Sequence, residues 1–180
     1  YTLRYLRDVC SELNYLYMKG CSGANDRDYE NLFRACPRLE TVSLAFNTNI
    51  RGKCLYGLKE TSVKHLVLDE CNNLRSKNLI SALRELKSLT HLSLNTCVNL
   101  SSSDICILTE TLPGLLSLSL AQYFPLLRSN SLKTLGCLHD LIHLNLQLNP
   151  SVNDEVMESI TQNCKKLQEL NITGECNHQT

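Results

Sequence analysis

The sequence predicts an α/β protein in which short strands and helices alternate along a right-handed solenoid. Three observations predict it: an aliphatic pattern that recurs along the chain, a turn residue at a constant distance after each copy, and helix-start residues in the intervals. A sequence with a fixed period folds as stacked copies of one unit, because no single unit can bury its apolar face alone. We therefore expect one domain over residues 1–180, built of about seven repeats.

The recurring pattern is apolar-x-x-apolar-x-apolar. Its first position falls on Leu13, Leu39, Val63, Leu89, Leu115, Leu141 and Leu167, so every step is 26 residues except one of 24. All 21 pattern positions are aliphatic, which includes Met18. Alternating apolar residues are typical of a strand with one buried face. Copies stacked in register place about seven such strands side by side in a parallel sheet, which we expect on the concave face with helices on the convex face.

Each strand is followed by a turn position that lies three residues after the pattern. It reads Cys21, Asn47, Cys71, Cys97, Tyr123, Asn149 and Glu175. Asn and Cys side chains can turn inward here and satisfy backbone groups as the chain leaves the strand. The turn position therefore predicts where each strand ends and where the chain turns toward the convex face.

Helix-start residues open the intervals between strands. N-cap residues followed by helical spacing occur at Asn25-Asp26, Ser76, Ser103-Asp104 and Asn153-Asp154. The interval between Leu39 and Val63 is two residues shorter than the others and contains Gly52 and Gly57. We expect a reduced, 3₁₀-like element there, because glycine disfavours a regular helix.

The composition excludes several functional classes. Eighteen basic and 18 acidic residues give a formal net charge of zero, which argues against a nucleic-acid-binding surface. The sequence lacks an apolar run long enough to span a membrane, so we expect no membrane partner. The ten cysteines include no C-x-x-C and no zinc-site spacing. We expect free thiols in a reducing compartment, the cytoplasm or the nucleus, with disulfides as the alternative.

Residues between the apolar positions face the concave side, where we expect a partner protein to bind. The side chains that we expect to contact it are Tyr15, Tyr17, His65, His91, Asn95, His143 and Asn145 on the strands, and Phe46, Tyr123 and Phe124 on the rim. Exposed aromatic side chains are frequent anchors of protein interfaces. Two alternatives stay open. Phe46 and Phe124 either anchor a partner or cover the ends of the core, and Tyr15 and Tyr17 either bind a partner or pack on a preceding repeat.

The chemistry-bearing residues do not form an ordered catalytic set. His65 and His91 occupy one column on neighbouring strands, and His143 lies two strands further on. Two converging side chains do not complete a metal site, so we expect surface histidines, with a metal or pH-sensitive site as the alternative. No recognisable Ser-His-acid or Cys-His arrangement and no phosphate-binding glycine motif occur. We therefore expect no catalytic residue, no metal and no cofactor.

The charges are unevenly distributed along the chain. Residues 51–87 contain eight basic and four acidic side chains, whereas residues 88–127 contain no Lys or Arg. The basic stretch either attracts an acidic partner or forms an ordinary solvated face. It has too few basic residues, and no aromatic stacking partners, to bind nucleic acid.

The repeat resembles the cysteine-containing class of leucine-rich repeats, which reads C-x-x-L-x-x-L-x-L-x-x-C-x-x-L with a period near 26. Cys10-x-x-Leu13-x-x-Leu16-x-Met18-x-x-Cys21 matches it at every position but Met18. The resemblance covers nearly the whole chain and implies a right-handed leucine-rich-repeat solenoid, or horseshoe. The class is best known from F-box leucine-rich-repeat proteins, in which the repeats capture a substrate for an SCF ubiquitin ligase. It also occurs in the antagonist-of-mitotic-exit family.

The resemblance implies a non-catalytic protein-binding domain, the substrate-recognition region of an F-box-type receptor. No F-box is visible in residues 1–180, so a Skp1-type adaptor would bind only through a region outside this chain. The alternative is a stand-alone leucine-rich-repeat scaffold or inhibitor without an F-box. Plant hormone-receptor F-box proteins hold an inositol phosphate in a basic concave cluster. That cluster is missing here, so we expect no such cofactor.

Overall fold

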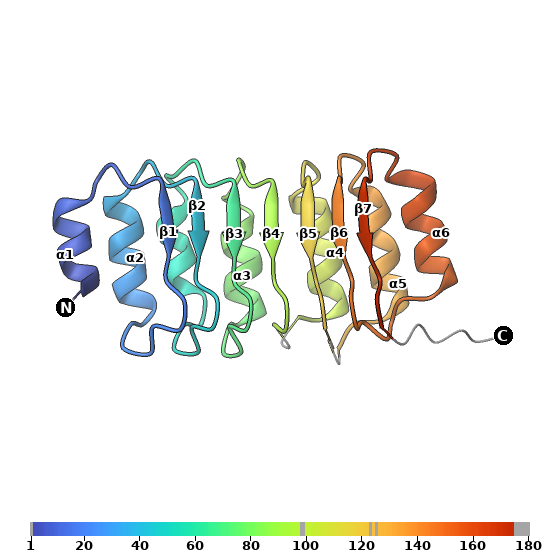
Figure 1. Ribbon diagram of the computed structural model, residues 1–180, viewed down its shortest axis with the longest axis horizontal. Coiled ribbons are helices and arrows are strands. Elements are labelled where there is room, and N and C mark those ends of the chain that lie inside the picture. Colours follow the sequence, from blue (N-terminus) through green and yellow to red (C-terminus); the bar gives the residue numbers. More distant parts are fainter. Residues whose placement is uncertain (1, 98–99, 123, 125, 175–180) are drawn as a thin grey trace.

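Seven short parallel strands form one open sheet along the concave face of the molecule (Figure 1). The computed structural model describes residues 2–97, 100–122, 124 and 126–174. The strands are β1 (Tyr15–Tyr17), β2 (Thr41–Ser43), β3 (His65–Val67), β4 (His91–Ser93), β5 (Ser117–Ser119), β6 (His143–Asn145) and β7 (Glu169–Asn171). Each strand pairs with the next strand in the sequence, which confirms the predicted solenoid and its parallel sheet.

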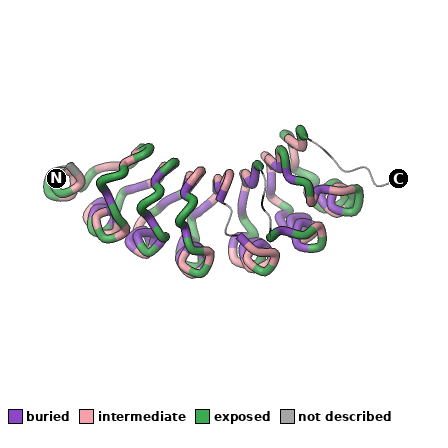
Figure 2. Tube along the Cα trace, turned by 90° about the horizontal axis from the view of Figure 1, so that it is seen from below, coloured by how far each residue is buried: buried purple, intermediate pink, exposed green. Residues whose placement is uncertain are grey.

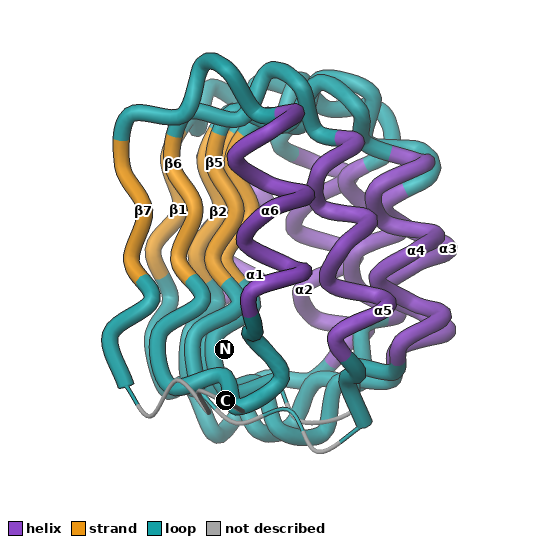
Figure 3. Tube along the Cα trace, turned by 90° about the vertical axis from the view of Figure 1, so that its right-hand side faces the viewer, coloured by secondary structure: helices purple, strands orange, loops and turns teal. Residues whose placement is uncertain are grey.

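A row of helices covers the convex side of the sheet, so strands and helices form two separate layers (Figure 3). The helices are α1 (Thr2–Val9), α2 (Asp26–Ala35), α3 (Ser76–Leu83), α4 (Ser102–Thr111), α5 (Ser129–Leu132) and α6 (Asp154–Asn163), with 3₁₀ helices η1 (Lys53–Leu58) and η2 (Lys133–Cys137). Buried residues lie between the two layers along the whole arc (Figure 2). In the described part of the chain, no helix combines the length and apolar character that crossing a membrane requires.

The strands are stacked without any shift in register. Leu16 pairs with Val42, Val42 with Leu66, and the same column continues through the central residue of every later strand. These central side chains point into the core, while the residues on either side of them point outward. Burying a Leu or Val side chain contributes about 1.5–3 kcal/mol. The aliphatic columns therefore fix both the register and the face that the sheet presents to solvent.

The N-cap predictions are confirmed at two helices and wrong at two others. Asn25 and Asn153 cap α2 and α6 through their side chains. Helix α4 begins earlier than predicted, because Ser101 and Asp104 form a reciprocal capping box. Ser76 is the first helical residue of α3, and its N-cap residue makes no side-chain capping bond.

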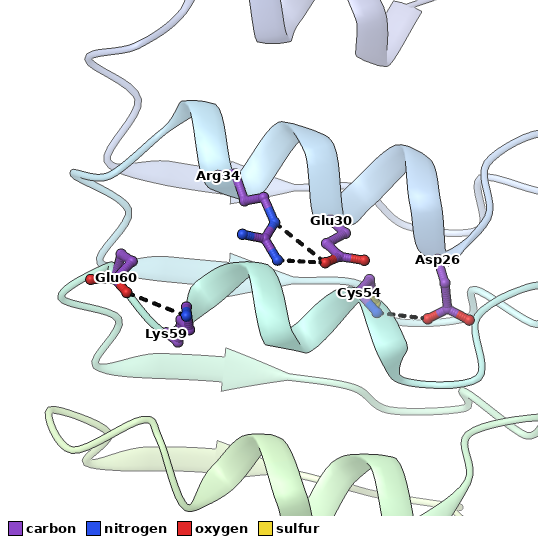
Figure 4. Close-up of polar contacts among 6 residues, drawn as sticks. All are labelled: Asp26, Glu30, Arg34, Cys54, Lys59 and Glu60. Carbon is purple, nitrogen blue, oxygen red and sulfur yellow. Dashed lines mark hydrogen bonds and ion pairs between the residues drawn. The ribbon is translucent and has the colours of Figure 1, made fainter.

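The short interval after β2 contains the predicted 3₁₀ helix, η1. The Asp26 carboxylate on α2 accepts hydrogen bonds from the backbone N–H groups of Arg51 (2.7 Å) and Cys54 (2.9 Å), so it ties the two elements together (Figure 4). A Cβ atom on Gly57 would lie 2.7 Å from the carbonyl oxygen of Glu30. Glycine is therefore required there by the close approach of η1 to α2.

A residue with left-handed backbone conformation follows each strand. The residues with positive φ at this point are Gly20, Phe46, Glu70, Thr96, Gln122, Leu148 and Gly174. The N–H groups of all these residues except Gly174 continue the ladder into the next repeat, as in the bonds from Phe46 to the Asp69 carbonyl (2.8 Å) and from Glu70 to the Asn95 carbonyl (2.9 Å). Non-glycine residues adopt this conformation at a cost. This column was not predicted, because only its first and last members are glycine.

The cysteine side chains at the turn position of the third and fourth repeats bond to backbone carbonyls, as predicted. The Cys71 thiol donates to the Leu44 carbonyl at 3.1 Å, and the Cys97 thiol donates to the Leu68 carbonyl at 3.1 Å. Each bond therefore links one repeat to the preceding repeat. The described cysteines are free thiols, which agrees with the prediction for that part of the chain, while Cys176 lies outside it.

The fifth repeat departs from the predicted alignment by one residue. The Leu127 N–H donates to the Phe124 carbonyl at 3.1 Å, which is the bond that Leu74 makes to Cys71 in the third repeat. Phe124 therefore takes the turn position that was predicted for Tyr123, and Tyr123 lies outside the described residues. Phe124 is 1% exposed, so the expectation that it anchors a partner is wrong. The one-residue shift of the turn places the Phe124 ring in the core.

Candidate protein-binding face

The concave face begins with an exposed aromatic group, which we call the aromatic corner (Tyr15, Tyr17 and Phe46). Tyr15 and Tyr17 point outward from β1 and are 58% and 69% exposed. Phe46 follows β2 in the sequence, has a φ of 63° and is 45% exposed. The ammonium group of Lys19 lies 4.5 Å from the centroid of the Phe46 ring, a cation–π contact. Apolar area beside a fixed positive charge can anchor a protein segment.

Two histidines stack in the middle of the face. The rings of His65 on β3 and His91 on β4 lie 4.0 Å apart between centroids, at an interplanar angle of 21°. The hydroxyl of Thr90 lies 2.8 Å from Nδ1 of His91. Burial, together with the nearby His65 and His143, lowers the pKa of His91. A lowered pKa keeps the ring neutral near pH 7, which allows the stack to form without charge repulsion.

A chain of hydrogen bonds runs along the end of the strands, and we call it the polar ladder (Asp69, Ser93, Asn95 and Ser119). The Asp69 carboxylate accepts bonds from the Ser93 hydroxyl (2.6 Å) and the Asn95 N–H (2.9 Å). The Asn95 carbonyl oxygen Oδ1 then accepts bonds from the Ser119 hydroxyl (2.6 Å) and the Ala121 N–H (2.7 Å). These bonds hold the Asn95 side chain in one orientation, so this part of the concave face is rigid.

Two adjoining shallow hollows extend over the face from β3 to β7. One hollow of about 410 Å³ is lined by side chains that include His91, Ser117, Ser119, His143, Asn145, Glu169 and Asn171. A second hollow of about 230 Å³ shares His91, Ser117 and Ser119 with it and extends to His65. The Nδ1 atom of His143 lies 3.1 Å from the Glu169 carboxylate at the far end. We call these two hollows together the concave groove.

The predicted site residues therefore separate into several groups. His65, His91, His143 and Asn145 line the concave groove, whereas Asn95 belongs to the polar ladder. The aromatic corner lies at the N-terminal end of the same sheet, and Phe124 is withdrawn into the core. Asp69 and Glu169 were not selected from the sequence, although both occupy outward positions of the repeat. Their position in the repeat was the available signal.

The arrangement of these groups is suited to binding. The Ser119 hydroxyl donates to Asn95, and Nδ1 of His91 lies beside Thr90, so these two side chains do not pair as nucleophile and base. Within the described ranges, no group of three or more His, Cys, Asp or Glu side chains is placed to hold a metal ion. The concave face exposes hydroxyl, amide and imidazole groups beside aromatic rings.

No family model and no curated protein matches this sequence. Solved structures match it at low identity. A chain of the Rad7–Elc1 complex from yeast matches with a TM-score of 0.70 and 17% identity, over 99% of this chain and 42% of that chain. Human 5T4, or trophoblast glycoprotein, matches with a TM-score of 0.62 and 16% identity (93% of this chain and 72% of that chain), and internalin C2 from Listeria monocytogenes with a TM-score of 0.53 and 18% identity (89% and 73%, respectively). This chain spans less than half the length of the Rad7–Elc1 chain that it matches. The fold places the protein in the class of leucine-rich-repeat solenoids.

Proposed function

We propose that this chain is the substrate-recognition region of an F-box-type receptor of an SCF ubiquitin ligase. It binds a protein partner on its concave face and catalyses no reaction itself. The observation that carries the proposal is the exposed aromatic corner on the same face as the concave groove. Large exposed aromatic side chains beside a polar surface are the usual composition of a protein interface.

The repeat class supports the ligase assignment. The cysteine thiols at the turn position bond to the preceding repeat, which gives the Cys-containing pattern a structural role in this chain. A chain of the Rad7–Elc1 complex, a protein assembly, shares the fold over 99% of this sequence. In this proposal a Skp1-type adaptor binds a region outside the chain, and the protein works in the cytoplasm or the nucleus.

The size of the face sets how a partner must bind. Adjacent strands lie about 4.8 Å apart, so the seven strands span roughly 30 Å. Three outward residues per strand give a strip of roughly 400 Å², about half of the roughly 800 Å² that each partner contributes to a stable interface. The partner must therefore also contact the rim, where Phe46 is exposed.

Purification of the full-length protein from cells tests the ligase assignment. We expect a Skp1-type adaptor to copurify, together with a protein that crosslinks to the concave face. The double variant Tyr15→Ala/Tyr17→Ala should lose the crosslinked protein and keep the adaptor. Tyr5→Ala is the matched control, because Tyr5 is 71% exposed on α1, away from the sheet.

Three other outcomes have definite meanings. Recovery of the crosslinked protein without any adaptor would identify a stand-alone scaffold and overturn the ligase assignment. Loss of thermal stability of the full-length protein in the tyrosine variant, with unchanged crosslinking, would show that the two tyrosines pack on another repeat. Equal loss of crosslinking in the Tyr5 control would exclude the aromatic corner as the anchor.

A further inference from the structure

Five basic side chains gather at the edge of the solenoid where the strands end and the convex helices begin. They are Arg27 on α2, Arg51 and Lys53 at the start of η1, and Arg75 and Lys77 at the start of α3. We call this group the basic edge. All five are exposed, and in the described structure none of them forms an ion pair.

The members of the basic edge are brought together by the stacking of repeats. The Arg75 N–H donates to the Arg51 carbonyl at 3.2 Å, and the Asn78 side chain donates to the same carbonyl at 2.8 Å. Lys53 and Lys77 each follow these arginines by two residues, so they occupy the same place in successive repeats. In Figure 4, Asp26 and Cys54 mark this end of α2 and η1, and the Lys59–Glu60 ion pair lies at the opposite end.

Two acidic side chains near this edge offset part of its positive charge, but among the described residues neither forms an ion pair with its cations. The Asp26 carboxylate accepts the backbone N–H groups of Arg51 and Cys54, and the Asp28 carboxylate accepts the N–H of Asn25. Both carboxylates are committed to backbone groups. On other parts of the surface the pairing is different: Arg34 binds Glu30 at 2.8 Å, and Lys64 binds Glu40 at 3.1 Å.

The charges at the start of α3 oppose the helix. The N-terminus of an α-helix carries a partial positive charge, so cations in its first turn are unfavourable. Arg75 is the N-cap residue of α3 without a side-chain capping bond, and Lys77 lies in the first turn. Asn25 and Ser101 cap α2 and α4, the α-helices before and after α3 in the sequence, in the usual way. A local conflict of this kind is relieved when negative charge arrives from outside.

We propose that the basic edge binds an extended acidic segment of a partner protein, on a surface separate from the concave face. Packed helices lie about 8–10 Å apart, which is close to three residues of an extended chain at about 3.3 Å each. An acidic side chain at every third position therefore matches the spacing from Arg27 to Lys53 to Lys77. The same edge carries Asp104 and Asp154 further along, so the repeats of α2, η1 and α3 define the docking surface.

A synthetic peptide tests the proposal directly. The probe is a labelled 12-residue segment (chosen length about four acid spacings) with glutamate at every third position, and its binding is followed by fluorescence anisotropy at increasing salt. Lys53→Glu/Lys77→Glu should weaken binding about tenfold or more. The matched control Arg84→Glu/Lys87→Glu reverses two exposed cations at the opposite end of the α3 repeat and should change binding less than about twofold.

Thermal unfolding separates loss of binding from loss of structure. Lys77→Glu places an acidic residue in the first turn of α3, which favours the helix. The Lys53→Glu/Lys77→Glu variant should therefore melt at the same temperature as the parent protein or higher while it loses the peptide. Tyr15→Ala/Tyr17→Ala should bind the peptide normally, so failure at the basic edge and failure at the concave face are distinguishable.

Each contrary outcome overturns the proposal. Equal weakening in the Arg84→Glu/Lys87→Glu control would show that the protein attracts the peptide by its overall field. A single-stranded oligonucleotide of equal charge that binds more tightly, and is lost in the Lys53→Glu/Lys77→Glu variant, would assign the edge to nucleic acid. Concentration-dependent self-association that disappears in that variant would assign it to a second copy of the chain.

Discussion

The hydroxyl of Tyr29 on α2 donates a hydrogen bond of 3.0 Å to Oδ1 of Asn47, the turn residue of the second repeat. Asn47 is 1% exposed, and its Oδ1 also accepts the N–H of Cys21 at 2.9 Å. Its amide nitrogen donates to the Leu44 carbonyl at 2.8 Å. One buried side chain therefore satisfies groups from two repeats, and it does so where water cannot replace it.

Asn47→Ala should be strongly destabilising. Removing the amide leaves the Tyr29 hydroxyl and the Cys21 N–H without their acceptor in the core, so we expect the free energy of unfolding to fall by about 2 kcal/mol or more. Asn149→Ala is the matched control at the equivalent turn, since Nδ2 of Asn149 has no hydrogen-bond partner among the described residues. Chemical denaturation measures both, and an equal loss in the two variants would contradict the role of this hydrogen-bond network.

Gly57→Ala should force η1 away from α2. The added Cβ would meet the Glu30 carbonyl oxygen at 2.7 Å and the Phe33 Cβ at 3.1 Å. Overpacking of this kind costs about 1–3 kcal/mol. Gly114→Ala is the control, because a Cβ there meets nothing within 4 Å. Thermal melting of the two variants checks the prediction, which fails if Gly57→Ala melts like the parent protein.

Thr96→Gly should stabilise the protein. Thr96 has a φ of 59°, a left-handed conformation that a β-branched residue adopts at a cost of about 1 kcal/mol or more. Glycine removes this strain, and we expect the midpoint of urea unfolding to rise. Thr41→Gly in β2 is the control, where glycine weakens an extended strand and should lower the midpoint. A lower midpoint in both variants would show that the Thr96 side chain compensates for its backbone.

The pKa of His91 should make stability depend on pH. Burial, His65 and His143 lower its folded-state pKa, so the unfolded chain binds the proton more readily. The stabilising effect of the neutral ring is complete above the unfolded pKa of about 6.5 and is lost as the pH falls from there through the folded pKa. NMR titration of the His91 ring should give a midpoint below about 6.5. His91→Asn should flatten the stability profile below neutral pH, and an unchanged profile would contradict the assignment.

The cysteines should differ sharply in reactivity. Burial raises the pKa of the Cys71 thiol to about 11 and that of the Cys97 thiol to about 12, whereas Cys137 is exposed. A thiol reagent at pH 8 should label Cys137 rapidly and the two buried thiols only after unfolding. Cys137→Ser is the control and should remove the contribution of Cys137 from the rapid labelling, while Cys71 and Cys97 stay unlabelled until unfolding. Because the folded pKa values are raised, stability should also fall as the pH rises above about 9.

The sequence predicts the strands more reliably than the surface. The aliphatic columns specify all seven strands and their register, because a one-residue slip would expose the whole buried face. Phe124 was not predicted to be buried, since the turn is shifted by one residue within a repeat that still has 26 residues, and this shift changes which ring is buried. The turn from Leu127 back to Phe124 is visible only in the backbone bonds.

The candidate site was predictable in position but not in function. The repeat identifies His65, His91 and Asn95 as outward residues, yet it does not say that two of them stack while the third is held by Asp69. The basic edge shows the same limit. The sequence reveals an excess of cations in residues 51–87, but only the structure shows that Asp26 is occupied by backbone groups.

Among the described residues, helices and strands contact one another only within a repeat or between neighbouring repeats. The stability of such an array is a sum of terms for single repeats and for the interfaces between neighbouring repeats, so a repeat with one neighbour unfolds more readily than a repeat with two. In the described structure β1 and β7 each have a single neighbouring strand, so amide hydrogen exchange should be faster in these two strands than in β4. Tyr15 and Tyr17 of the aromatic corner lie on β1, so a protein bound to them should slow exchange in the first repeats of the described structure.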